Sequence, residues 1–284
     1  PNCQITYKDG YIYTGFWNSE TNEANCVCIS TTDEDLLNQT EEKKATWTHT
    51  QKGGYYWAGA YIDSTGSFML EGTDDGEGGY KTGYAHILSM NPATGEVLDD
   101  LTLPHTGDVR SNITHDTQGS NATGDYYFTS KGGYLYRVSV GADGKFKKNT
   151  LRWIKLENGK NDNSAMSTST PTIYNGRAYV GVSGNSQFGQ YSGHGIAVLD
   201  LGTMTMAYYI PTQGYPQTSG ILTRGYEQES GKVYVYFFDN FTPGKLRVIS
   251  DQPGQTAMAE ETEESLNGTT YKTGYVLFLS LIHI

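Results

Sequence analysis

The chain is poor in positive charge and in cysteine, and it contains no long apolar run. Only 20 Lys and Arg stand against 31 Asp and Glu among 284 residues, so the formal net charge is −11. Phosphate backbones and anionic lipid surfaces repel such a chain, so we expect no nucleic-acid partner. A membrane-spanning helix needs about 20 apolar residues, which no run approaches, so we expect no membrane insertion.

The three cysteines, Cys3, Cys26 and Cys28, have a spacing that suits neither a zinc knuckle nor a redox CxxC motif. Cys26 and Cys28 alternate within a strand-like pattern, which puts both sulfurs on one face. We expect small buried hydrophobic side chains at these positions. The alternative is a disulfide from Cys3, and the sequence does not say whether Cys26 or Cys28 would be its partner.

Glycine and tyrosine are abundant, with 35 and 23 residues, and strongly periodic helical stretches are missing. This composition is typical of a turn-rich all-β protein. The stretch 53–103 contains four short apolar runs, at 55–62, 67–71, 85–90 and 96–103, with Gly, Asp, Asn and Pro between them. Four such runs joined by tight turns predict an antiparallel meander.

The four-run pattern recurs about every 50 residues. The units cover 1–50, 51–104, 105–157, 158–213 and 214–258, and a further unit begins at 259–273. A four-stranded sheet repeated at this period predicts a β-propeller, in which each sheet is a blade that packs against its neighbours. We therefore predict an all-β fold, with residues 1–273 forming a partial propeller of about five blades.

Two stretches carry a resemblance to a known superfamily. ILSMNPATGEVLDDL at 87–101 resembles the repeat of PQQ-like, or quinoprotein-type, β-propellers, and YYFTSKGGYLYRVSV at 126–140 is similar to propeller domains of bacterial surface and secreted proteins. Such propellers have seven or eight blades, so the resemblance implies a truncated ring. It also implies an extracellular or cell-surface location.

The C-terminal end differs in character from the repeats. Residues 276–284 read VLFLSLIHI, an apolar run with no turn signal. The final letters resemble translated sequencing-adapter read-through. We therefore treat residues 274–284 as a doubtful, non-native tail.

In this superfamily, loops that lead into first strands and loops between second and third strands meet at one mouth of the central channel. The ligand-binding residues that we predict on these loops are His49, Asp74, Arg110, Lys131, Gln217 and Asp239. His49 and Arg110 are each expected to begin a first strand. Arg110 could bind an anionic group or a sugar hydroxyl with its planar fork, or it could pair with Asp108.

Catalytic signatures are missing from the chain. It has no GxSxG elbow, no Cys-Cys pair, and Val97-Leu98 where quinoprotein dehydrogenases carry the Trp of their docking repeat. We predict no catalytic residue, no metal site and no cofactor, PQQ included. Asp74 and Asp75 could chelate Ca²⁺ together with carbonyl groups, but we favour an ordinary turn for the DDG sequence.

The function that we predict is a non-catalytic binding or interaction domain, extracellular or at the cell surface. Its ligand at the channel mouth would be a glycan, a peptide or a partner protein. One alternative is a glycan-active lyase or hydrolase that uses the same mouth, with Asp74 and Asp239 as its paired carboxylates. The other alternative is a scaffold for the assembly of envelope proteins.

Overall fold

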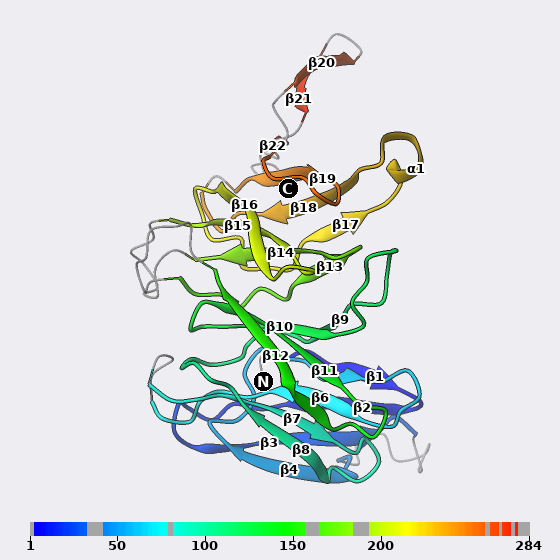
Figure 1. The fold of residues 1–284 in the computed structure, drawn as a ribbon. Coiled ribbons are helices and arrows are strands. Elements are labelled where there is room, and N and C mark those ends of the chain that lie inside the picture. The colour runs from blue at the N-terminus through cyan, green and yellow to red at the C-terminus, as the bar shows by residue number, and fades with distance from the viewer. Residues whose placement is uncertain are drawn as a thin grey trace. The chain divides into compact units, whose positions relative to one another are not determined.

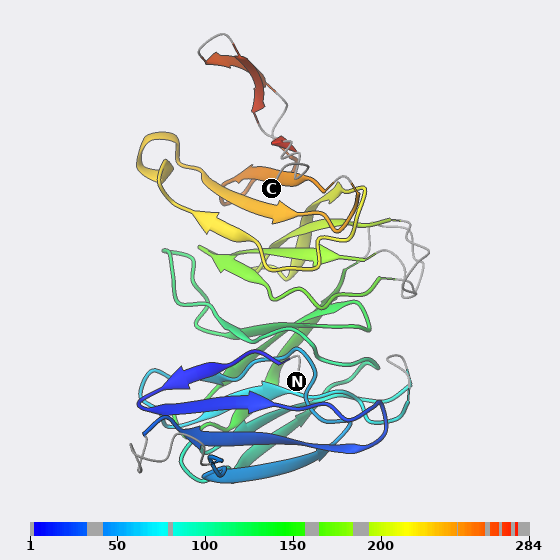
Figure 2. The same cartoon turned by 180° about the vertical axis from the view of Figure 1, so that it is seen from behind.

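The computed structural model describes residues 3–32, 42–78, 82–156, 165–183, 193–242, 244–258, 262–266, 269–273 and 276–277. Over these ranges the chain forms four-stranded sheets whose strands lie side by side in chain order (Figure 1, and from behind in Figure 2). The predicted all-β fold, built from repeated four-strand units, is confirmed.

The five four-stranded sheets of the described ranges are numbered along the chain. Sheet 1 consists of β1 (Thr6–Lys8), β2 (Tyr11–Gly15), β3 (Glu23–Ser30) and β4 (Trp47–Lys52). Sheet 2 consists of β5 (Tyr61–Ile62), β6 (Met69–Gly72), β7 (His86–Met90) and β8 (Val97–Thr102). Sheet 3 consists of β9 (Thr114–His115), β10 (Tyr126–Ser130), β11 (Tyr134–Val140) and β12 (Phe146–Lys155).

Sheet 4 consists of β13 (Thr172–Tyr174), β14 (Arg177–Val182), β15 (Gly195–Asp200) and β16 (Thr205–Pro211). Sheet 5 consists of β17 (Ile221–Thr223), β18 (Val233–Phe238), β19 (Leu246–Asp251) and β22 (Val276–Leu277). A short helix α1 (Glu227–Ser230) lies between β17 and β18, and β20 (Thr262–Leu266) pairs with β21 (Thr269–Thr273) as a separate hairpin.

The chain divides into two compact units. Unit 1 comprises residues 1–114, 125–132 and 136–151, and unit 2 comprises residues 115–124, 133–135 and 152–284. Sheets 1 and 2 therefore belong to unit 1, sheets 4 and 5 belong to unit 2, and the residues of sheet 3 are divided between them.

Two of the hairpin turns explain why the strands begin where they do. Asp9 and Gly10, between β1 and β2, have φ angles of 47° and 87°. Asn175 and Gly176, between β13 and β14, have φ angles of 51° and 77°. Positive φ at both central residues is typical of a type I′ turn, which matches the right-handed twist of the two strands and favours Asp-Gly and Asn-Gly.

The core of unit 1 is the packing of sheet 1 on sheet 2. Its members occupy every second position of a strand, such as Cys26 and Cys28 of β3 or Leu88 and Met90 of β7, because alternate side chains share one face. The cluster consists of Tyr13, Cys26, Cys28, Trp47, Tyr55, Ala60, Met69, Leu88 and Met90. In unit 2, sheet 4 packs on sheet 5 through an equivalent cluster of Tyr174, Tyr179, Ile196, Val198, Ile210, Val233, Val235, Phe237 and Ile249.

All three cysteines are free thiols. Cys26 and Cys28 are buried in the cluster between sheets 1 and 2, as predicted. Cys3 is half-buried and donates its Sγ–H to the backbone oxygen of Tyr55 over 2.8 Å. Burial raises the pKa of Cys3 to about 11, so this thiol stays protonated at neutral pH.

Only part of the C-terminal region lies within the described residues. The hairpin β20–β21 falls in the segment 259–273, where the sequence predicts the start of a further blade. Val276 and Leu277 form β22, which pairs with Arg247 and Leu246 of β19. The rest of the doubtful tail is outside the described residues, so its non-native origin stays a prediction.

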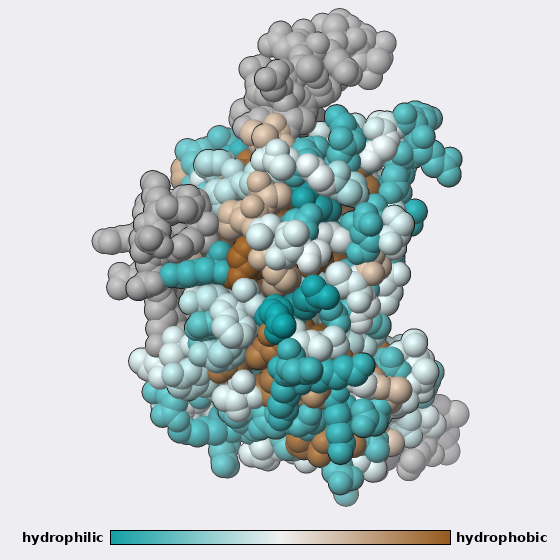
Figure 3. Space-filling view, viewed as in Figure 1, coloured by the Kyte–Doolittle hydropathy of each residue, from teal (hydrophilic) through white to brown (hydrophobic). Residues whose placement is uncertain are grey.

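On the face seen in Figure 3, hydrophilic residues cover most of the surface and hydrophobic atoms form separate small patches. This agrees with a chain whose Asp, Glu, Lys and Arg make up 18% of its residues. Within the described part of the chain, no helix has the length and apolar character that crossing a bilayer requires.

Candidate functional site

One backbone hydrogen bond recurs beside the mouth loops of four sheets. In each sheet, the loop between the second and third strands donates an N–H to the segment that leads into the first strand. The pairs are Asp74 N to Gly54 O, Lys131 N to Asp108 O, Ser183 N to Met166 O, and Asn240 N to Tyr215 O, at 2.8 to 3.0 Å. The two kinds of loop that the superfamily resemblance brings together are therefore in contact in each of these sheets.

In unit 1 the loops of neighbouring sheets are also joined. Tyr55 N donates to Phe16 O over 2.9 Å, and Val109 N donates to Thr73 O over 3.0 Å. Backbone hydrogen bonds thus connect four segments in series: the β2–β3 loop, the segment before β5, the β6–β7 loop and the segment before β9. Five charged side chains from these loops and from the β10–β11 turn meet as a result.

These five charged side chains form the charged cluster, which consists of Glu20, Asp74, Asp108, Arg110 and Lys131. Arg110 donates Nε–H to Asp74 Oδ1 over 2.9 Å and Nη2–H to Asp74 Oδ2 over 2.5 Å, a two-point pair. Nη2 of Arg110 also lies 3.0 Å from Asp108 and 3.4 Å from Glu20. Lys131 Nζ donates to Asp108 over 3.1 Å.

Three of the six predicted site residues, Asp74, Arg110 and Lys131, therefore lie in one cluster. Of the two roles that the sequence leaves open for Arg110, the structure shows the pairing with carboxylates. Its side chain is 4% exposed, and those of Asp74 and Asp108 are 0% exposed. Breaking a buried, paired set of charges is costly, so this part of the cluster holds the loops together.

Burial raises the pKa of Asp74 to about 7, and the nearby Asp108 adds to the shift, although Arg110 opposes it. Burial alone would lower the pKa of Arg110, but its hydrogen bonds and charge interaction with Asp74 raise it above its ordinary value. Arg110 is thus always charged. The two-point pair is complete when Asp74 is ionised, and it weakens as the pH falls through about 7.

Aromatic side chains stack beside the charged cluster. The rings of Trp17 and Tyr56 are 4.7 Å apart at 21°, and those of Tyr56 and Trp57 are 4.7 Å apart at 27°. Arg110 Cζ lies 4.4 Å from the centroid of Tyr56 and 5.8 Å from that of Trp57, which is within the range of a cation–π interaction. Trp17, Tyr56 and Trp57 form the aromatic stack, and all three are half-buried.

Trp57 has a strained backbone. Its φ angle is 64°, in the left-handed region that a bulky residue with a Cβ rarely adopts. Residues 55–60 form no strand, although the sequence predicts one over 55–62, and only Tyr61 and Ile62 join sheet 2. Strained positions are concentrated at functional sites, because the surrounding structure must hold them in place. At this strained position Trp57 stacks on Tyr56.

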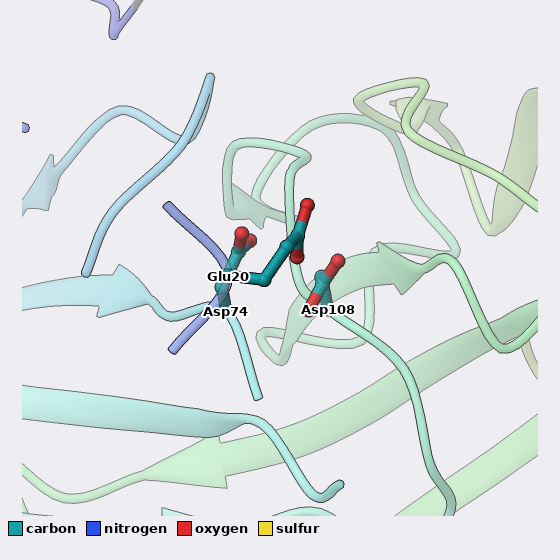
Figure 4. Close-up of side chains that lie close together, drawn as sticks. All are labelled: Glu20, Asp74 and Asp108. Carbon is teal, nitrogen blue, oxygen red and sulfur yellow. The ribbon is translucent and has the colours of Figure 1, made fainter. Parts of the chain in front are cut away.

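Three carboxylates of the charged cluster have the arrangement of a metal site but are already paired with a cation. One oxygen from each of Glu20, Asp74 and Asp108 lies within 4.8 Å of the others, and Figure 4 shows these side chains close together. The guanidinium of Arg110 contacts all three. Asp75 is engaged too, since it accepts from the backbone N–H groups of Glu77 and Gly83. The positive charge that Ca²⁺ would supply therefore comes from Arg110.

The residues of this site do not fit PQQ, the cofactor that the superfamily suggests. The quinone would need a flat stacking pocket and a metal held by carboxylates. The rings of the aromatic stack face one another and Arg110, and the carboxylates hold Arg110.

Of the other predicted residues, His49 is misplaced in the sequence interpretation. It lies within β4, the fourth strand of sheet 1, opposite Cys26 of β3, and it does not lead into a first strand. The sequence predicts this strand over residues 43–48, whereas β4 covers Trp47–Lys52 and so includes His49. Burial lowers the pKa of His49, which favours its neutral form.

Asp239 and Gln217 belong to the loops of sheet 5 in unit 2. Asp239 is buried and accepts from Arg247 Nε over 3.0 and 3.2 Å. Gln217 lies before β17, half-buried, and its N–H donates to Tyr215 O over 2.9 Å. The loop positions predicted for both residues are those observed, and their role in binding stays a prediction.

Sequence reasoning missed Glu20, Trp17 and Tyr56. Glu20 and Trp17 lie in the β2–β3 loop, from which none of the six predicted binding residues comes. Tyr56 falls inside a run that has the composition of a strand. The signal that could find all three is the recurring loop position, applied to residues of every type.

A buried carboxyl group lies close to this site in the chain. Glu71, on β6, is 0% exposed, and its Oε2 accepts the Sγ–H of Cys26 over 3.0 Å. Its Oε1 has no hydrogen-bond partner among the described residues. Burial raises the pKa of Glu71 to about 7, and the bond from Cys26 opposes the shift only in part.

A cavity of about 210 Å³ is found elsewhere in unit 1, with Lys8, Tyr13, Cys28 and Pro92 among its lining residues. Burial raises the pKa of Cys28, so its thiol is a poor nucleophile at neutral pH. This cavity does not include any residue of the charged cluster or the aromatic stack.

No protein-family model matches the chain, and no curated protein matches it. Solved structures do. A europium-containing methanol dehydrogenase has a TM-score of 0.57 and 10% identity, over 88% of this chain and 49% of that one. A candidate 6-phosphogluconolactonase of Bacteroides fragilis has a TM-score of 0.58 and 14% identity, over 96% of this chain and 70% of that one. The β-propeller domain of Cps50 (Swd1) from Myceliophteria thermophila has a TM-score of 0.50 and 12% identity, over 91% and 67%.

At these identities the similarity shows the fold alone, and the chain spans about half the length of the methanol dehydrogenase. The four-stranded sheets follow one another in chain order, as the blades of a propeller do. The chain has the fold of a β-propeller, as its repeat predicts.

Proposed function

We propose that this propeller is a non-catalytic binding domain, extracellular or at the cell surface, whose ligand contacts the mouth loops of unit 1. The observation that carries the proposal is the aromatic stack, whose half-buried rings lie beside the charged cluster. Half-buried Trp and Tyr give large contact area at a small entropic cost, which is why they are frequent at binding sites. The acidic, lysine-poor composition supports a location outside the cell.

The engagement of Asp74 supports a binding role over a catalytic one. A catalytic carboxylate must be free to reach a substrate, whereas both oxygens of Asp74 accept from Arg110 and its side chain is 0% exposed. The ligand classes that suit the loops are a glycan, a peptide or a partner protein, because each offers flat or extended surfaces to aromatic rings.

One observation favours the second candidate, a glycan-active lyase or hydrolase. The pKa of Asp74, raised to about 7, is that of a carboxyl group able to donate a proton near neutral pH. Turnover of a glycan, abolished by Asp74→Asn, would support the enzyme. Binding without turnover supports the binding domain.

Removing the outer rings of the aromatic stack is expected to weaken ligand binding about thirtyfold. The Trp17→Ala/Trp57→Ala double variant loses the packing of two large side chains, and such anchors typically contribute about 2 kcal/mol or more to binding. A combined glycan and peptide array would identify the ligand, and titration calorimetry would measure its affinity for both proteins.

Trp153→Ala is the matched control. This tryptophan is 43% exposed and lies in unit 2, so its removal should leave the affinity unchanged. A ligand that binds the double variant and the parent protein equally well would rule out the aromatic stack as the binding surface.

A further inference from the structure

The charges of the site differ in their access to water. The Arg110 and Lys131 side chains are each 4% exposed, and Asp74 and Asp108 are 0% exposed. Glu20 is the exception, with 41% of its side chain exposed. An incoming ligand therefore meets the carboxylate of Glu20, while the two cations are buried and already paired.

The local charge balance favours a cation. Asp75, whose N–H donates to Asp108 over 2.9 Å, adds a fourth carboxylate to those of Glu20, Asp74 and Asp108, while Arg110 and Lys131 are the two cations. The formal excess is thus negative, in a chain whose net charge is −11. Such a field attracts cationic ligands and repels anionic ones.

The site already binds one cation, the chain's own guanidinium. Arg110 lies over Tyr56 at 4.4 Å and contacts Glu20, Asp74 and Asp108. Aromatic faces combined with carboxylates recognise ammonium and guanidinium groups through cation–π attraction and charge-assisted hydrogen bonds. Trp17 and Trp57, at the two ends of the aromatic stack, are half-buried, and Glu20 follows Trp17 by three residues in the β2–β3 loop.

We propose that Glu20, Trp17 and Trp57 bind a primary ammonium or guanidinium group, presented as the lysine or arginine side chain of a peptide. This inference rests on the proposed binding function and narrows its ligand class. Arg110 then serves as a buried tie between loops, not as a receptor for anions. Glu20 makes only long contacts to Arg110, at 3.4 and 3.5 Å, so it is available for a second cation.

The test is a set of titrations at 20 mM NaCl, followed by the intrinsic tryptophan fluorescence, to which Trp17 and Trp57 contribute. The probes are acetyl-(Lys-Gly)4-amide, the same peptide with norleucine or glutamate in place of lysine, and spermidine as a free polyamine. The lysine peptide should bind at least about tenfold more tightly than the norleucine peptide, because one charge-assisted hydrogen bond contributes that much. The glutamate peptide should not bind, and 500 mM NaCl should abolish most of the difference.

Glu20→Gln should weaken the binding of the lysine peptide at least about tenfold. Glu23 is an exposed glutamate of β3, so Glu23→Gln should leave this affinity unchanged. Equal binding of spermidine supports the cation class and assigns its source to a free polyamine. Suppose that a neutral glycan binds the parent protein and Glu20→Gln equally well but does not bind Trp17→Ala. That result would overturn the proposed cationic ligand and leave the proposed binding function intact. If no peptide, polyamine or glycan changes the tryptophan fluorescence, both proposals fail.

Discussion

Replacing Arg110 with methionine is expected to lower the free energy of unfolding of unit 1 by about 3 to 5 kcal/mol, the usual result of removing one partner from a buried ion pair. Methionine fills much of the space of the arginine stem but leaves Asp74 and Asp108 buried, with only Lys131 to balance them. Urea titration followed by tryptophan fluorescence measures the effect, because Trp17, Trp47 and Trp57 all lie in unit 1.

The stability that Arg110→Met loses should depend on pH in a defined direction. The pKa of Asp74 is about 7 in the parent protein and rises further without Arg110, so at pH 5 this carboxyl group is neutral in both proteins and the lost ion pair costs less. The variant should therefore be more strongly destabilised at pH 8 than at pH 5. Arg224→Met is the control, because its pair with Glu227 is on the surface and should contribute little to stability. A loss below about 1 kcal/mol at pH 8 for Arg110→Met would show that the charged cluster does not hold the loops together.

Glu71→Gln is expected to remove a large pH dependence from the stability of unit 1. In the unfolded chain the carboxyl group ionises above its ordinary pKa of 4.5, whereas in the folded protein it keeps its proton up to about pH 7. Between these values only the unfolded state releases a proton, so the free energy of unfolding falls as the pH rises. The fall is complete above pH 7 and amounts to about 3 kcal/mol, since one pKa unit corresponds to about 1.4 kcal/mol.

The quantity to measure is the difference in free energy of unfolding between Glu71→Gln and the parent protein. A neutral amide resembles the protonated acid, so the difference should be small at pH 4.5 and should favour the variant by about 3 kcal/mol at pH 8. The pKa of Asp74 is also raised, but Asp74 is present in both proteins, so its contribution cancels in the difference. The control Glu23→Gln should give a difference that is flat with pH. A flat difference for Glu71→Gln itself would mean that this carboxyl group is ionised in the folded state.

Sequence reasoning succeeds for the features that local chemistry determines. Asp9-Gly10 and Asn175-Gly176 are recognisable turns because few residues tolerate positive φ at two successive positions. The alternation that buries Cys26 and Cys28 on one face is equally local. The repetition of these local signals at a period of about 50 residues predicts a propeller, and the similar solved structures have that fold.

The site was predictable in part, because loop position follows from strand order. Asp74 and Lys131 lie on the predicted loops and meet Arg110 in the charged cluster, but Arg110 does not begin a first strand as predicted, because β9 starts only at Thr114. His49 fails because the fourth strand of sheet 1 begins only at Trp47, and a shift of a few residues moves a side chain from a loop into a strand. The strand predicted over 55–62 fails for the opposite reason, because residues 55–60 have the composition of a strand but form none, and Trp57 among them has a strained backbone. These errors concern where pairing begins, which depends on tertiary contacts.

The most direct test of the binding site is the NMR spectrum of the four tryptophan indoles in the 15N-labelled full chain. Trp17 and Trp57 belong to the aromatic stack, Trp47 donates its Nε1–H to Pro92 O within the core of unit 1, and Trp153 lies in unit 2. On titration with acetyl-(Lys-Gly)4-amide, the indole signals of Trp17 and Trp57 should shift with a common affinity, while those of Trp47 and Trp153 stay in place. Shifts confined to Trp47 or Trp153 would contradict a ligand site on the mouth loops of unit 1.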